Sequence, residues 1–200
     1  MKRKALILFM ILTMGSSLFA HMETRLAGQL AWEWDSGKDS LGDLKEEDIR
    51  LGGVQLEFVG HRLGFGVDSL VNFYTDHYDD WYLDWQGNIF LRYHLFGSDS
   101  FIDPFIEAGF GNAGSVNLDY PSEETLKLSL YPSLSTGLNL VFSEGLYMGG
   151  RFTYRPTDAV IPVTDFPKPA LGRYQATFYV GMAFGHYCNR HHCHHHHYYD

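Results

Sequence analysis

The last fifteen residues of the chain hold its densest group of metal-ligating side chains. The group comprises His186, Cys188, His191, His192, Cys193, His194, His195, His196 and His197. Imidazole nitrogens and thiolate sulfurs are strong ligands for zinc, nickel and copper, and a His-rich tract is a compositional signal for metal capture. We therefore predict a metal site of low selectivity in this tail, and no other part of the sequence requires a cofactor.

The tail also has a simpler interpretation. It is a disordered extension whose two cysteines, Cys188 and Cys193, form a short disulfide in an oxidising compartment. Asn, Arg and Cys residues stand among the histidines, which argues against an affinity tag.

Three histidines in the body of the chain, His61, His77 and His94, are the candidates for acid–base catalysis. A hydrolase or acyltransferase needs a nucleophile such as serine beside a histidine and an acid. His61 falls in an expected tight turn, His77 in an acidic loop and His94 on the polar face of a strand. Solvated or structural roles suit these positions, so we expect no enzymatic activity and assign no catalytic residue.

The chain begins with the features of a secretory signal peptide. Lys2, Arg3 and Lys4 precede an apolar run over residues 5–14, and small residues follow up to Ala20. The run is shorter than the roughly 20 apolar residues of a transmembrane helix. We therefore expect residues 1–20 to be a removed signal peptide, residues 21–185 to form the body, and residues 186–200 to form the tail.

Apolar and polar residues alternate with a period of two through the body, which is the pattern of β-strands. Within 81–95, for example, Trp85 and Ile89 fall on one face, while Asp84 and Arg92 fall on the other. The pattern predicts eight strands, at 25–34, 50–58, 62–75, 81–95, 101–112, 126–142, 146–155 and 173–184. Pro132 is expected to leave one ladder hydrogen bond unmade, with a bulge as an option.

The connections between these strands alternate in length. Segments 35–49, 76–80, 113–125 and 156–172 are the longer ones, while 59–61, 97–100 and 143–145 are tight turns. Outer-membrane barrels have this asymmetry, because their periplasmic turns are short and their extracellular loops are long.

The polar face decides which side points inward, because a soluble barrel shares the alternation but buries its apolar face. Small residues recur on it: Gly64, Gly66, Gly109, Gly111, Ser129, Ser133, Ser135, Gly137, Gly181 and Ala183. Charges of both signs share it: Arg25, Glu33, Glu57, Arg62, Asp68, Asp84, Arg92, Asp103, Glu107, Lys127, Arg151, Arg155 and Arg173. Small side chains suit a narrow lumen, where charges must pair. We predict an all-β fold, a transmembrane eight-stranded antiparallel up-and-down barrel with an interlocked polar plug.

Aromatic residues gather toward both ends of the expected strands, where membrane barrels have interfacial girdles. One group comprises Trp32, Trp34, Phe73, Trp81, Trp85, Tyr154 and Tyr174, and the other comprises Phe58, Phe142 and Phe184. A β-sandwich core is the alternative interpretation of these residues.

In architecture the chain resembles the small eight-stranded outer-membrane barrels, the class of the OmpA transmembrane domain, OmpX and OmpW. In the last strand, Tyr179, Gly181 and Phe184 resemble the C-terminal signal that barrel-assembly machinery reads in that class. The class has a further aromatic two residues on, where this chain has His186. The resemblance implies location in the bacterial outer membrane, with outer-membrane lipid and the assembly machinery as partners.

The expected function is that of a structural or adhesin-like surface barrel. A net charge of −9 argues against nucleic-acid binding. The acidic segment 35–49 and the proline-rich segment 156–172 are the candidate sites for an extracellular ligand, and the latter could instead cover the barrel mouth. OmpW-like passage of small solutes and metal capture by the tail are the alternatives.

Overall fold

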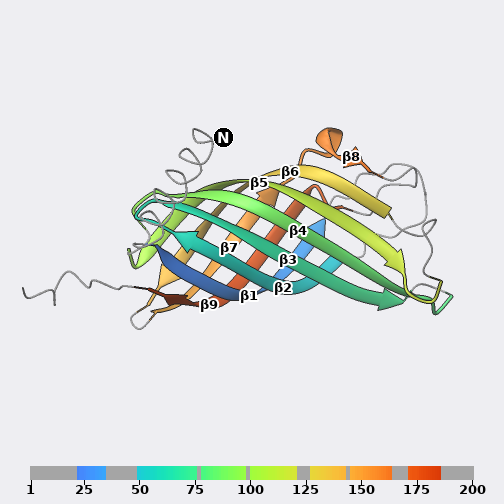
Figure 1. The fold of residues 1–200 in the computed structure, drawn as a ribbon, viewed down its shortest axis with the longest axis horizontal. Coiled ribbons are helices and arrows are strands. Elements are labelled where there is room, and N and C mark those ends of the chain that lie inside the picture. The colour runs from blue at the N-terminus through green and yellow to red at the C-terminus, as the bar shows by residue number, and fades with distance from the viewer. Residues whose placement is uncertain are drawn as a thin grey trace, which may run out of the picture.

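The computed structural model describes residues 22–34, 49–75, 78–97, 100–120, 127–142, 145–163 and 171–185. The expected signal peptide, the loop 35–48 and the tail lie outside these residues. In the described residues the chain is almost entirely β-structure, and its strands close into a barrel (Figure 1).

Eight long strands form the barrel wall: β1 (Glu23–Trp34), β2 (Ile49–Val59), β3 (Leu63–Thr75), β4 (Trp81–His94), β5 (Ile102–Asn117), β6 (Lys127–Val141), β7 (Leu146–Tyr154) and β9 (Tyr174–Phe184). Each pairs antiparallel with the next, and β9 pairs with β1 to close the ring. The last connection contains the 3-10 helix η3 (Thr157–Ala159) and the short strand β8 (Ile161–Pro162). The predicted fold is confirmed, and seven of the strands match their predicted bounds closely.

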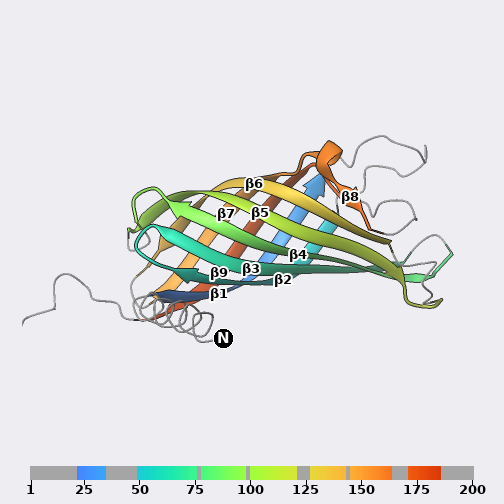
Figure 2. The same cartoon turned by 45° about the horizontal axis from the view of Figure 1, so that its top comes forward.

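The strand register fixes the stagger of the barrel. A path that moves from each residue to its partner on the next strand runs from Thr24 through Phe58, Phe65, Leu91, Ala108, Leu134, Tyr154 and Tyr174, and returns to β1 at Trp34. The path returns at position 34 instead of position 24, a stagger of ten residues. Strands in such a barrel tilt by roughly 35–45° from its axis, and Figure 2 shows this oblique course.

Burial alternates along the strands, with the polar face inside. In β1, Arg25 and Glu33 are buried while Leu30 and Trp32 are exposed. Large apolar side chains are exposed on all eight wall strands, among them Leu26, Val54, Val67, Ile89, Ile106, Leu134, Phe152 and Val180. A soluble protein buries such groups, so this outer surface is built to face lipid.

The small residues of the polar face make room for large side chains in the lumen, as the sequence predicts. At Gly149 of β7, a Cβ atom would lie 2.6 Å from ring atoms of Tyr179 on neighbouring β9. That separation is shorter than van der Waals contact. Glycine therefore lets the Tyr179 ring lie flat against the inner wall.

One expectation is wrong and one option is excluded. The strand continues through Pro132 as predicted, and the optional bulge does not form toward β5, because Pro132 pairs with Phe110 in an unbroken register. It lies beyond Leu134, the last residue of β6 that pairs with β7. Arg62 does not line the lumen, because it lies exposed in the turn between β2 and β3, where the alternation of the strands has ended.

The two ends of the barrel differ, and we name them by their connections. The turn end carries the tight turns, the start of β1 and the end of β9, while the loop end carries the longer connections. Near the loop end, Trp34, Phe152 and Tyr174 form an aromatic group with ring centroids 5.9 to 6.2 Å apart. At the turn end, Phe58 stacks on Phe65 at 5.3 Å. Both groups suit the interfaces of a membrane.

Candidate functional site

Five charged side chains from five strands meet in the lumen. They are Glu57 of β2, Asp68 of β3, Arg92 of β4, Glu107 of β5 and Arg151 of β7, and we call them the central ion-pair network. Alternation places each on the inner face of its strand, and barrel closure then brings together residues as far apart in sequence as Asp68 and Arg151.

The network is continuous, because the Glu107 carboxylate bridges the two arginines. Arg92 donates from Nη1 to Glu57 Oε2 at 2.8 Å, and from Nε and Nη2 to Glu107 Oε2 at 3.0 and 2.7 Å. Arg151 Nη1 donates to Glu107 Oε1 at 3.1 Å and to Asp68 Oδ2 at 2.8 Å. All five side chains are at most 3% exposed. Charge-assisted hydrogen bonds of this kind are among the strong ones in proteins.

Aromatic rings complete the surroundings of Arg92. Its guanidinium carbon lies 4.0 Å from the centroid of the Phe105 ring and 4.9 Å from that of Phe90. Both rings point into the lumen with the polar residues and are buried. They exclude water from the ion pair and attract the cation through their π-faces.

A second chain of contacts continues from the network to the turn end. His94 Nδ1 lies 2.6 Å from Asp103 Oδ2, and His94 Nε2 lies 3.4 Å from Glu57 Oε1. Asn139 Nδ2 donates to the same Asp103 oxygen at 2.9 Å, and the Tyr179 hydroxyl donates to Asn139 Oδ1 at 2.5 Å. This half of the lumen is thus crossed by hydrogen bonds between side chains of β4, β5, β6 and β9, and His94 also lies in ionic contact with Glu57 of β2.

A smaller group, the mouth cluster, fills the lumen near the loop end. It consists of Glu33, Gln86, Arg155 and Gln175. The Glu33 carboxylate accepts hydrogen bonds from Arg155, from Gln86 at 2.9 Å and from Gln175 at 2.8 Å. The Arg155 guanidinium also lies over the Tyr131 ring, 5.0 Å from its centroid. The single cation of this cluster faces a single carboxylate.

Part of the last connection lies over the mouth cluster, and we call it the strap, residues 156–163 and 171–172. Val160 and Leu171 of the strap are buried together with Ala113 and Tyr131 of the wall. The Gly172 backbone N–H donates to Glu33 Oε2 at 3.1 Å, and β8 pairs with β6 at Leu130 and Ser129. In its described residues, then, the proline-rich segment covers the mouth, which was one of its two expected roles.

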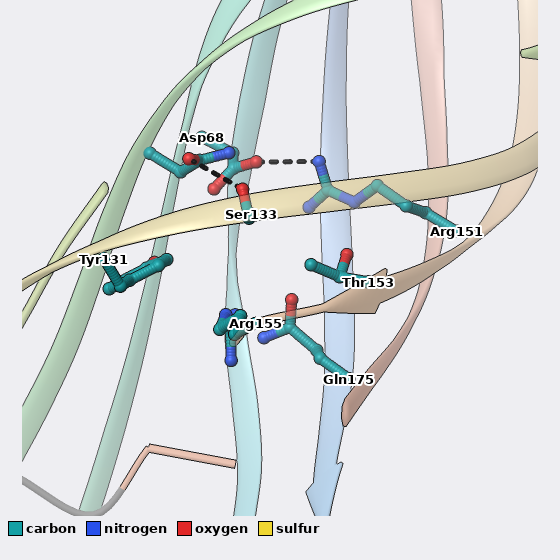
Figure 3. Close-up of a pocket in the computed structure, with 8 residues that line it drawn as sticks. Asp68, Tyr131, Ser133, Arg151, Thr153, Arg155 and Gln175 are labelled. Atoms are coloured by element: carbon teal, nitrogen blue, oxygen red, sulfur yellow. Dashed lines mark hydrogen bonds and ion pairs between the residues drawn. The ribbon is translucent and has the colours of Figure 1, made fainter. Parts of the chain in front are cut away.

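A small cavity of about 10 Å³ separates the two polar groups. Figure 3 shows Asp68 and Arg151 joined on one side of it, with Tyr131, Arg155 and Gln175 on the other. Such a volume holds about one water molecule. Among the described residues, the lumen therefore offers little room for a solute at this level.

One part of the wall extends past the rest at the loop end, as Figures 1 and 2 show for β3, β4 and β5. We call the projecting part the flap: residues 72–75 of β3, 81–84 of β4 and 115–117 of β5. Its strands pair with one another, as in Tyr74 with Tyr82 and Tyr82 with Asn117. In the described residues β2 pairs with β3 only as far as Val71, so the flap continues without β2.

The other predicted site residues fall as follows. His94 lies in the lumen as expected, and its ring nitrogens contact the carboxylates of Asp103 and Glu57, with no nucleophilic serine or cysteine in this set of described residues. His61 is exposed in its turn, and His77 lies outside the described residues. The nine metal-ligand candidates at 186–197 also lie outside them, as does the loop 35–48. In the described ranges, no group of three or more His, Cys, Asp or Glu could hold a metal ion.

Sequence reasoning missed three features of this site. It did not identify the Glu33 partners, the pairing of β8 with β6, or the flap. The extension of β5 into the flap could not be predicted, because residues 111–115 are Gly, Asn, Ala, Gly and Ser, which show no alternation of apolar and polar side chains. In the part of the chain that the structure describes, no helix is long and apolar enough to span a membrane.

Comparison with known proteins supports the fold. No protein family and no curated protein matches the sequence. The N-terminal β-barrel domain of Pseudomonas aeruginosa OprF is similar in structure, with a TM-score of 0.54 and 13% identity over 80% of this chain and 97% of that one. Neisserial surface protein A (NspA) has a TM-score of 0.51 and 13% identity, over 83% of this chain and 97% of that one.

The fold is therefore that of the small eight-stranded outer-membrane barrels. Large apolar side chains are exposed on all eight wall strands, which indicates that the barrel is embedded in a bilayer. Barrels of this type belong to the outer membrane of bacteria.

Proposed function

We propose that the protein is a structural or surface-interaction barrel whose lumen is plugged, and that it is neither a diffusion pore nor an enzyme. The observation that supports this proposal best is the central ion-pair network. Eight strands enclose an interior just wide enough for side chains to fill. Here the space is crossed by Arg92 and Arg151 with their carboxylate partners.

A solute that crossed the lumen would have to separate these ion pairs. Breaking a buried pair leaves a charge without its partner, at a cost of about 3–5 kcal/mol. The mouth cluster and the strap would form a second barrier at the loop end, where Glu33 holds Arg155 and Gly172. Because two barriers in series oppose passage through the lumen, we propose that the protein acts through the outer surface of its loop end.

The loop end offers the surface that an interaction needs. The flap projects there, and Ile161 and Val163 of the strap are more than half exposed. The neighbour NspA is, by its name, a surface protein. Segments 35–49 and 156–172 remain our proposed sites for an extracellular ligand, and we propose the barrel-assembly machinery and outer-membrane lipid as the partners in the membrane.

Protease treatment of intact cells tests the orientation on which this function depends. We expect cleavage within 35–49 or 156–172 and protection of residues 186–200. A matched strain with a protease site in the turn at 95–101 should resist cleavage. Cleavage of the tail alone would overturn the proposal. Adhesion of cells with and without the protein to host-cell surfaces and matrix proteins then tests the surface role, and equal adhesion would argue for a purely structural barrel.

Passage of small apolar solutes is the second candidate function. An apolar groove of about 460 Å³ on the outer wall favours it, since a solute that leaves sideways would pass there. The groove lies over β3, β4 and β5, between Phe65, Ile89 and Phe110. Uptake of an apolar dye into liposomes containing the barrel would support passage, and uptake equal to that of empty liposomes would exclude it.

Metal capture by the tail is a separate proposal, supported by its nine His and Cys residues. Zinc or nickel titration of the full chain and of a chain lacking residues 186–200 tests it. We expect binding only by the full chain, and equal binding by both would remove the proposal.

A further inference from the structure

The flap has two unlike faces, and its inner face carries an uncommon set of side chains. Tyr74 and Tyr82 stack with ring centroids 5.4 Å apart and an angle of 15° between the planes. Tyr74 is 38% exposed. The two rings thus form one stacked aromatic pair beyond the barrel mouth, of which Tyr74 is the more exposed member.

Carboxylates stand beside these rings. Asp84 follows Tyr82 by two positions in β4 and therefore shares its face of the strand. Asn117 of β5 donates to the Tyr82 hydroxyl at 3.2 Å and to Asp80 Oδ2 at 3.3 Å. These hydrogen bonds hold the Tyr82 ring and place a second carboxylate near its hydroxyl edge.

We propose that this inner face binds an arginine-rich segment of a polypeptide. The inference rests on the surface-interaction function proposed above and names its partner. A guanidinium stacks flat on a tyrosine ring and donates charge-assisted hydrogen bonds to a carboxylate oxygen, so one arginine matches both features of the face. An ammonium group cannot stack flat on a ring.

Charge near the flap favours a cationic partner. The described residues that adjoin it, 78–80 and 118–120, contain three carboxylates, Asp79, Asp80 and Asp119, and no lysine or arginine. Such a field attracts cations and speeds their encounter with the protein. It repels anionic partners such as the phosphates of nucleic acids or lipid headgroups.

The outer face of the flap suits the membrane interface, so we place the binding surface for the partner on the inner face. Phe73 and Trp81 on that outer face are 58% and 52% exposed, and aromatic groups of this kind belong at a membrane interface. The flap is three strands wide and about four residues long, roughly 10 by 13 Å at ordinary strand spacing. A surface of that size fits one short segment and predicts transient binding.

The test uses the purified full-length barrel in a zwitterionic detergent, with fluorescent deca-arginine as the probe and anisotropy as the readout. We expect saturable binding that weakens as salt increases. The double variant Tyr74→Leu/Tyr82→Leu should bind at least fivefold more weakly, although its net charge is unchanged. The matched control, Tyr154→Leu/Tyr174→Leu, removes two neighbouring tyrosines elsewhere on the wall, whose ring centroids lie 5.7 Å apart, and should stay within twofold of the parent.

Deca-lysine should bind more weakly than deca-arginine to the parent barrel. Asp84→Asn, a single substitution, gives a second measurement and should lower the affinity even if the double variant fails to fold. Equal affinity of parent and flap variants, or of the two peptides, would overturn the inference. If cells adhere through the protein but the purified barrel does not bind deca-arginine, only this inference fails. If the cells do not adhere and the barrel does not bind the peptide, the proposed surface function fails as well.

Discussion

The central lumen and the loop end use charge in opposite ways. In the lumen, Arg92 and Arg151 are enclosed by carboxylates on several strands, and each cation is bonded to two of them. At the loop end, carboxylates such as Asp79 and Asp119 are exposed, and cations are few in the connecting segments. The Asp119 carboxylate accepts a hydrogen bond from the Trp81 backbone N–H at 2.6 Å. The barrel therefore uses buried ion pairs to hold its strands together and exposed carboxylates to face the solvent.

The difference follows from the solvent that each region meets. A charge inside the lumen has lost its water and must find a partner in the protein. A charge on a loop keeps its hydration and needs no fixed partner. Substitutions in the lumen should therefore change stability, while substitutions at the loop end should change binding.

The largest effect is expected for Arg92→Met. This change leaves Glu57 and Glu107 buried without their shared cation. We expect the free energy of unfolding to fall by about 3–5 kcal/mol, measured by urea unfolding in lipid vesicles with tryptophan fluorescence. A loss below about 1 kcal/mol would show that the network contributes little to stability.

Arg155→Met in the mouth cluster should cost less, about 1–3 kcal/mol. Glu33 loses its cation but keeps donors from Gln86, Gln175 and the Gly172 backbone. The same unfolding assay compares the two arginines directly. A loss larger than that of Arg92→Met would reverse the contrast between the central lumen and its mouth.

Tyr179→Phe removes one hydroxyl from the turn-end half of the lumen. Its hydrogen bond to Asn139 Oδ1 is lost, while the ring keeps its place against Gly149. The expected loss is about 1 kcal/mol. Phe152→Leu on the outer wall serves as a control for a change of ring size without a hydrogen bond.

The smallest effect on stability is expected for Tyr74→Leu/Tyr82→Leu in the flap. Both rings lie beyond the last pairing of β2 with β3, at the exposed margin of the sheet. We expect the free energy of unfolding to change by no more than about 0.5 kcal/mol per residue. A loss as large as that of Arg92→Met would make the flap part of the stable barrel and contradict the comparison.

The sequence was sufficient for the strands and for the direction of their faces. A period of two identifies a strand locally, and small residues such as Gly149 beside charges such as Arg151 identify its inward face. These signals lie within a few residues of one another. They can therefore be recognised without knowing the register of the strands.

The partners of each charge could not be predicted in the same way. Arg155 and Glu33 are 122 residues apart, and their meeting depends on the closure of the whole ring. The stagger of the barrel decides which inward residues share a level, and no local pattern encodes it. The mistaken placement of Arg62 has a local cause, since one step past a strand end the alternation no longer applies.

The strap shows how tertiary packing overrides a composition signal. Its prolines and apolar residues suggested either a partner surface or a cover. In the structure Val160 and Leu171 turn inward onto Tyr131, while Ile161 and Val163 face outward. One short segment thus supplies both kinds of surface, which composition alone does not separate.

Planar-bilayer recording of the purified full-length protein tests most directly whether the lumen is plugged. With the central ion-pair network intact, we predict no stable openings of large conductance over the physiological voltage range. A large and stable conductance from the unmodified barrel would contradict the plugged lumen and, with it, the proposal that the protein acts through its loop end.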